Sequence, residues 1–133
     1  MAISSRDDWL LREMRLLGSV LARMLGQKNG GQLQEALQTL DDAEGELLGV
    51  MGDVAPRVDA ATAAHMLREP LRIAGWARLL HERAELLRQS GDVAGAALAA
   101  HRAAELAAEA RARAEGHESA VRELLEPLAD TSR

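Results

Sequence analysis

The sequence lacks several residue types on which whole classes of protein depend. Its 133 residues include no cysteine, which excludes disulfide bonds and thiolate metal sites. Phenylalanine and tyrosine are also absent, and tryptophan occurs only twice. No apolar run approaches the ~20 residues that a membrane-spanning helix requires. We therefore expect a chain that folds without disulfides and does not cross a membrane.

Lysine is almost absent, and acidic residues outnumber basic ones. The formal net charge is −5, and Lys28 is the only lysine, so arginine carries nearly all of the positive charge. Nucleic-acid binding usually depends on clustered positive charge and on aromatic stacking platforms, and the sequence has neither. Charged residues precede any apolar run at the amino terminus, which argues against a signal peptide. We predict a cytoplasmic protein that binds neither nucleic acid nor membranes.

Alanine and leucine are abundant and β-branched residues are few, which favours helix along nearly the whole chain. A chain of this length can bury the core of one domain. We predict an all-α, single-domain fold of about five to six helices, built from antiparallel helical hairpins. The predicted parts are a first hairpin at 6–48, a loop with a short helix at 49–69, a second hairpin at 70–115 and a carboxyl-terminal helix at 118–130.

Two glycine-containing turns set where the hairpins fold back. Asn29-Gly30-Gly31 interrupts the first hairpin, and Ser90-Gly91-Asp92 interrupts the second. Glycine permits the positive φ angles that a tight turn after a helix requires. Asp92 is suited to cap the next helix, whose alanine-rich face allows close packing against its neighbour. The whole prediction depends on the chain reversing at both turns.

The first predicted helix carries two apolar strips. The first strip follows helical spacing and comprises Leu10, Met14, Leu17, Leu21 and Met24. The second strip comprises Trp9, Leu16 and Val20. A helix with two apolar strips usually has a neighbour on each side. We expect another helix of this chain to cover the second strip, and self-association through it, as a homodimer, is the alternative.

Residues 31–43 and 91–103 echo each other. In both segments a turn glycine is followed, at the same offsets, by an apolar residue, a small residue, a further apolar residue and an alanine. This pattern resembles the second helix of a tetratricopeptide repeat, in which helical hairpins stack side by side. The two glycines are 60 residues apart, whereas tandem repeats recur at ~34. The resemblance therefore implies two tetratricopeptide-like hairpins separated by an irregular insert.

The layout as a whole also resembles an uncharacterised bacterial family of tetratricopeptide-like proteins. The resemblance rests on the opening Trp9-Leu10-Leu11-Arg12 and on the late Gly91-Asp92 hairpin. It implies a bacterial protein with the same arrangement of hairpins, and it implies no particular activity.

A polar stripe follows one face of the helix predicted after Pro70. Its members are spaced by three, four and three residues, and they are Arg78, His81, Glu85 and Arg88. In tetratricopeptide hairpins the first helix of each pair lines the concave binding surface, so the resemblance implies that this stripe faces a groove. Arginines there could hold an acidic peptide or a carboxylate. The alternative is a solvated stripe with i,i+4 pairs such as Arg78–Glu82.

Arg83 is a charged residue that lies within the apolar arc of this helix. Helical spacing places it beside Trp76, Leu80 and Leu87. A charge in such a place must be paired or must extend to water. We expect a structural arginine that stacks on Trp76 or pairs with an acid on a neighbouring helix. The alternative is an anion-binding residue at the floor of a pocket.

Catalytic and metal-binding motifs are largely missing. His81-Glu82-Arg83-Ala84-Glu85 starts like a zinc-protease motif but lacks the second histidine. Acidic pairs such as Asp41-Asp42, and Glu123 with Glu126, could hold magnesium on facing helices. Such pairs are also common on any solvated helix surface. We predict no catalytic residue, no metal and no cofactor.

Together these patterns predict a non-catalytic module that binds another protein or peptide in a helical groove beside Arg78, His81 and Arg88. Structural homo-oligomerisation is the first alternative. The second alternative is a magnesium-dependent all-α hydrolase that uses the acidic pairs.

Overall fold

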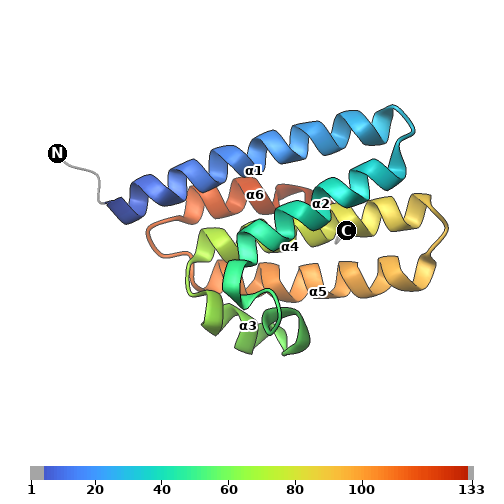
Figure 1. Ribbon diagram of the computed structural model, residues 1–133. Coiled ribbons are helices and arrows are strands. Elements are labelled where there is room, and N and C mark those ends of the chain that lie inside the picture. Colours follow the sequence, from blue (N-terminus) through green and yellow to red (C-terminus); the bar gives the residue numbers. More distant parts are fainter. Residues whose placement is uncertain (1–4, 132–133) are drawn as a thin grey trace.

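The computed structural model describes the backbone of residues 5–131 and the side chains of residues 9 and 11–129. This part of the chain is 85% helical and contains no strand, which confirms the predicted all-α class (Figure 1). The α-helices are α1 (Ser5–Asn29), α2 (Leu33–Leu48), α3 (Ala60–Leu67), α4 (Pro70–Gln89), α5 (Val93–Ala112) and α6 (Glu118–Thr131). Two short 3-10 turns, η1 (Gly49–Met51) and η2 (Ala55–Arg57), lie between α2 and α3.

Helix α4 lies at the centre of the fold (Figure 1). It starts at Pro70, because a proline in the first turn gives up no hydrogen bond that the helix would otherwise make. Its buried residues include the five consecutive residues 73–77, so burial extends around the helix. Helix α5 packs along it, and α2 and α6 cover two further sides. A helix that is apolar on nearly every side is stable only when it is surrounded in this way.

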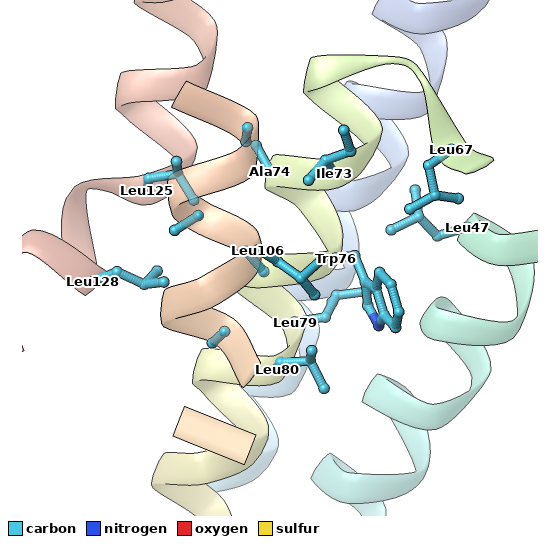
Figure 2. Packing of buried hydrophobic residues seen from close by; sticks show 14 of the residues in the cluster. Leu47, Leu67, Ile73, Ala74, Trp76, Leu79, Leu80, Leu106, Leu125 and Leu128 are labelled. Carbon is cyan, nitrogen blue, oxygen red and sulfur yellow. The ribbon is translucent and has the colours of Figure 1, made fainter. Parts of the chain in front are cut away.

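The core forms where the side chains of these helices meet α4. Figure 2 shows Trp76 projecting from α4 toward α2, while Leu106 and Leu125 belong to α5 and α6 on the other side. Trp76 is the largest fully buried side chain among the described residues. An aromatic side chain of this size contributes a large part of the burial energy of a small core.

The two hairpins, α1–α2 and α4–α5, turn in the same way. At each turn the residue after a glycine donates its N–H to the carbonyl five positions earlier, at 2.8 Å after α1 and 2.9 Å after α4. The glycines, Gly31 and Gly91, have positive φ angles of 77° and 90°. This is the Schellman pattern, which favours glycine at that position. The second turn is also capped, because the Asp92 carboxylate accepts a hydrogen bond from the Gly95 N–H at 2.9 Å.

Helix α1 is less buried than α4. Leu17 and Met24 are buried, whereas Met14 and Leu21 of the same predicted strip are only half-buried. The fifth member, Leu10, has its side chain outside the described residues. Helix α1 packs mainly on α2 and approaches α4 at Gly75, where an added Cβ would lie 3.1 Å from Leu17 Cδ2. One side of α1 therefore stays open, and it borders the candidate site.

Candidate binding groove

The interface between α2 and α4 is closed by a polar network around Trp76. The Trp76 indole Nε1 donates a hydrogen bond to Glu44 Oε2 at 2.9 Å. Arg83 of α4 pairs with Asp41 of α2, and its Nη1 lies 3.6 Å from Glu44 Oε2. On the α5 side the guanidinium of Arg102 lies over the Trp76 ring, 5.4 Å from its centroid. These contacts join the two hairpins, and they pair a cation of α4 with carboxylates of α2.

Arg83 is thus paired with acids on a neighbouring helix, which is one of the two structural roles expected for it. It does not stack on Trp76, because Arg102 takes that place. Two carboxylates already neutralise the Arg83 charge, so the residue does not form an open anion site. The partner acids lie 42 and 39 positions earlier in the chain, too far for helical spacing to reveal them.

A groove lies between α1 and α6, with α4 beneath it. It contains a hollow of about 270 Å³ lined by residues of all three helices. Those residues are Met14, Gly18 and Leu21 of α1, Arg78 of α4, and Ala120, Glu123 and Leu124 of α6. The groove exists because α6 docks on α4 and α5 and makes at most slight contact with α1.

The α1 wall of this groove is a continuous apolar stripe. Helical spacing extends it in both directions, to Leu11, which is 50% exposed, and to Leu25, which is 48% exposed. The steps between the five positions 11, 14, 18, 21 and 25 are three, four, three and four, which is the seam spacing of a coiled coil. At the middle of the stripe Gly18 leaves open space, because an added Cβ would meet nothing within 4 Å. This stripe has the form of a helix-packing surface without its partner helix.

Arg78 lies in the lining of the groove with few partners of its own. Its Nη1 donates to the Leu124 carbonyl at 3.2 Å, and its Nε has no hydrogen-bond partner. Within the described residues the one carboxylate in ion-pair range is that of Glu82, at 4.0 Å from Nε. The side chain is 21% exposed, almost the same as the 22% of Arg83. Its charge is therefore much less well neutralised than that of Arg83.

The structure separates the four residues of the predicted polar stripe. Only Arg78 borders the groove. His81 is buried, at 8% exposed, and burial lowers its pKa from the ordinary value of 6.5, so the imidazole is neutral at neutral pH. Glu85 and Arg88 pair with each other at 2.7 Å near the end of α4. The prediction of one open stripe is wrong for His81, because α4 is enclosed by its neighbours.

The second strip of α1 is also different from the prediction. Leu16 is 58% exposed and Trp9 is 39% exposed, so no helix in the described part of the chain covers them as expected. Val20 is half-buried and borders, with Leu16, a shallow hollow of about 150 Å³ between α1 and α2. The guanidinium of Arg72 lies 5.2 Å from the centroid of the Trp9 ring. Helix α2 reaches only the edge of this strip.

A second hollow, of about 320 Å³, lies between the end of α5 and α6. Charged side chains of both signs border it, namely Arg111, Glu118, Arg122 and Glu126. The α1–α6 groove differs in that helical spacing continues its α1 wall to the half-exposed Leu11 and Leu25. Among the described residues no group of three or more His, Asp or Glu side chains is arranged to hold a metal ion.

The residues that form the groove wall were only partly predictable. Met14 and Leu21 were assigned to the core strip, Leu124 was assigned to the apolar residues of the last helix, and Gly18 and Ala120 were not singled out. The seam spacing from Leu11 to Leu25 could have indicated the groove wall. It was obscured because Met14 and Leu21 also belong to the strip that contains Leu17.

Comparisons with known proteins supply no further guide. The chain matches no known protein family, no curated protein and no solved structure. None of the helices in the described residues is both long and apolar enough to cross a membrane. The function has to be argued from the chain's own geometry.

Proposed function

We propose that this protein is a non-catalytic interaction module, built from tetratricopeptide-like hairpins, that binds an amphipathic helix of another protein in the α1–α6 groove. The observation that carries the proposal is the open seam of α1, with Gly18 at its centre. Helix-in-groove recognition uses apolar anchors spaced three and four residues apart, and the seam offers the complementary surface.

Three features of the groove support this function. Helical spacing continues its α1 wall to two leucines that are about half exposed, Leu11 and Leu25, and a contiguous exposed apolar surface is typical of an interaction site. Its α6 wall adds Ala120 and Leu124, both half-buried. Its middle has no side chain at Gly18, so a partner backbone can approach closely there. A partner helix would bury both walls at once.

The experiment fills the groove without disturbing the core. Gly18→Gln places a long polar side chain in the hollow, while Gly26→Gln adds the same side chain to the same helix away from the groove. Both glycines are exposed and have open space at the Cβ position, so both variants should fold. Proteins captured from bacterial lysate are compared by quantitative mass spectrometry. We expect Gly18→Gln to lose specific partners by about tenfold or more and Gly26→Gln to keep them. Identical partner sets for the two variants would contradict the proposal.

Self-association through Trp9, Leu16 and Val20 is a second candidate, and the 58% exposure of Leu16 is the observation that favours it. Sedimentation of the wild type against Leu16→Glu tests it directly. A dimer that the substitution dissociates would support this function, and a monomeric wild type would end it.

A further inference from the structure

We infer that the helix bound in the α1–α6 groove carries an acidic residue at the centre of its apolar face, which pairs with Arg78. This inference rests on the proposed function and specifies the chemistry of the partner.

The inference starts from the incomplete neutralisation of Arg78. A guanidinium has five N–H donors, and the described contacts of Arg78 use one of them, in a hydrogen bond to a backbone carbonyl. Its ion pair with Glu82 is long, at 4.0 Å, and Glu82 is on the same helix. A bound helix would remove the remaining water from Arg78, and leaving a cation unpaired in a dry interface is costly. A carboxylate on the partner would avoid that cost with charge-assisted hydrogen bonds.

Arg83, on the same helix as Arg78, is an arginine whose charge is neutralised by carboxylates of a neighbouring helix. The two side chains are almost equally exposed, but Arg83 has two carboxylates from α2. On the Arg78 side of α4, the neighbouring helix α6 supplies a backbone carbonyl, and within the described residues it places no carboxylate in ion-pair range of Arg78. The partner helix would supply to Arg78 what α2 supplies to Arg83.

The position of the acid follows from the lining of the groove. Gly18 and Arg78 line the same hollow, so the partner backbone comes closest where Arg78 is within reach. We therefore place a small residue of the partner against Gly18 and the acid one helical turn away on the same face. Glu123 is exposed on the α6 wall of the same hollow and would repel a second carboxylate, so we place the acid on the α1 side of Arg78.

A second copy that docks through its own α1 does not meet this requirement. The five seam positions of α1 carry Leu, Met, Gly, Leu and Leu, none of them acidic. Pairing two such seams would cover Arg78 without neutralising it. The charge of the groove therefore favours a different protein with an acid at the seam.

The test uses a displayed library of helical peptides with leucine at the heptad seam positions and with the central seam positions randomised. Peptides are selected on the wild type and then sorted by loss of binding to Gly18→Gln, with Gly26→Gln as the control. We expect Asp or Glu to be enriched about tenfold at one central position among the Gly18-sensitive peptides. The enrichment should disappear on Arg78→Gln and persist on Arg78→Lys, which keeps the charge. Circular dichroism checks that each variant is folded. If Arg78→Gln does not fold, Arg78→Lys is compared with the wild type instead. A preference for Lys or Arg at that peptide position, on either protein, would contradict the inference.

The outcomes separate this inference from the proposed function. Gly18-sensitive peptides with no acidic preference, or with one that persists on Arg78→Gln, would overturn the pairing with Arg78 and leave the groove as a helix-binding site. An absence of Gly18-sensitive peptides would overturn both. A wild-type dimer that Gly18→Gln dissociates would identify a second copy as the occupant and also overturn the inference.

Discussion

The two sides of α4 differ in how far the chain itself completes them. On the side facing α2, Trp76 and Arg83 have hydrogen-bonded or ion-paired partners on the neighbouring helix. On the side facing α1 and α6, Arg78 lies in a groove with one hydrogen bond and a long ion pair. Both sides contain an arginine of similar exposure, so burial alone does not distinguish them. The number of carboxylates that a neighbouring helix brings into ion-pair range does: α2 brings two to Arg83, and in the described residues α6 brings none to Arg78.

This difference separates structural residues from candidate binding residues. A partly buried charge with its partners in place contributes to holding the fold together, and removing it leaves those partners unsatisfied. A charge without full partners contributes little to folding and is available to a ligand. The comparison therefore predicts large stability effects on the α2 side and mainly binding effects on the groove side.

The largest expected effect is that of Trp76→Ala. It empties the largest buried site of the core and removes the hydrogen-bond donor to Glu44, so we expect the free energy of unfolding to fall by about 3–5 kcal/mol. Trp9→Ala is the control, because that ring is 39% exposed and its loss should cost about 1 kcal/mol or less. Urea unfolding followed by far-ultraviolet circular dichroism measures both. Equal losses of unfolding free energy for Trp76→Ala and Trp9→Ala would contradict the conclusion that the α2 side of α4 holds the core together.

A smaller effect distinguishes the two arginines. Arg83→Met leaves Asp41 and Glu44 without their cation, and we expect a loss of about 1.5 kcal/mol after allowance for solvent screening. Arg78→Met removes one hydrogen bond to a carbonyl and a weak ion pair, and we expect a loss of about 0.5 kcal/mol. The same unfolding measurement applies. Should Arg78→Met cost as much as Arg83→Met, Arg78 would be a structural residue like Arg83.

The smallest effect is a pH dependence from His81, one turn beyond Arg78. Burial lowers the pKa of His81 in the folded state, so the unfolded chain, with a value near 6.5, binds the proton more readily. Stability should therefore fall as the pH drops below 6.5, and His81→Gln should reduce that fall. His101→Gln, at an exposed histidine, is the control. Identical pH profiles for the wild type and His81→Gln would show that His81 is more accessible to water than its burial indicates.

The elements of the fold were predictable because their signals are local. Gly31 and Gly91 end their helices through positive φ angles, and Pro70 begins α4. The echo between 31–43 and 91–103 has a turn glycine at the same point of each segment, and the two turns share one hydrogen-bond pattern. The hairpins predicted at 6–48 and 70–115 compare with observed helix pairs that span 5–48 and 70–112.

The site was predictable only in part, because helical spacing gives the faces of a helix but not its neighbours. Arg83 was identified as a charge that needed a partner, but Asp41 and Glu44 lie on another helix. His81 was placed in a solvated or groove-facing stripe, and the neighbours of α4 bury it. Leu16 was expected to be covered, and it is exposed. In each case the information that the sequence did not supply concerns contacts between helices.

The sequence by itself determined that this chain forms helices and where they reverse, since propensity, proline and glycine act within a few residues of each position. Only the tertiary structure decided which faces of α1 and α4 are covered, because α1 offers more apolar surface than its neighbours can bury. Helix α2 packs on one side of α4 and places carboxylates beside Arg83. Helix α6 packs on α4 and α5, and the seam around Gly18 stays exposed. The outcome depends on how the helices pack together, and it places Arg78 in a groove where its one ion pair, within the described residues, is the long contact with Glu82.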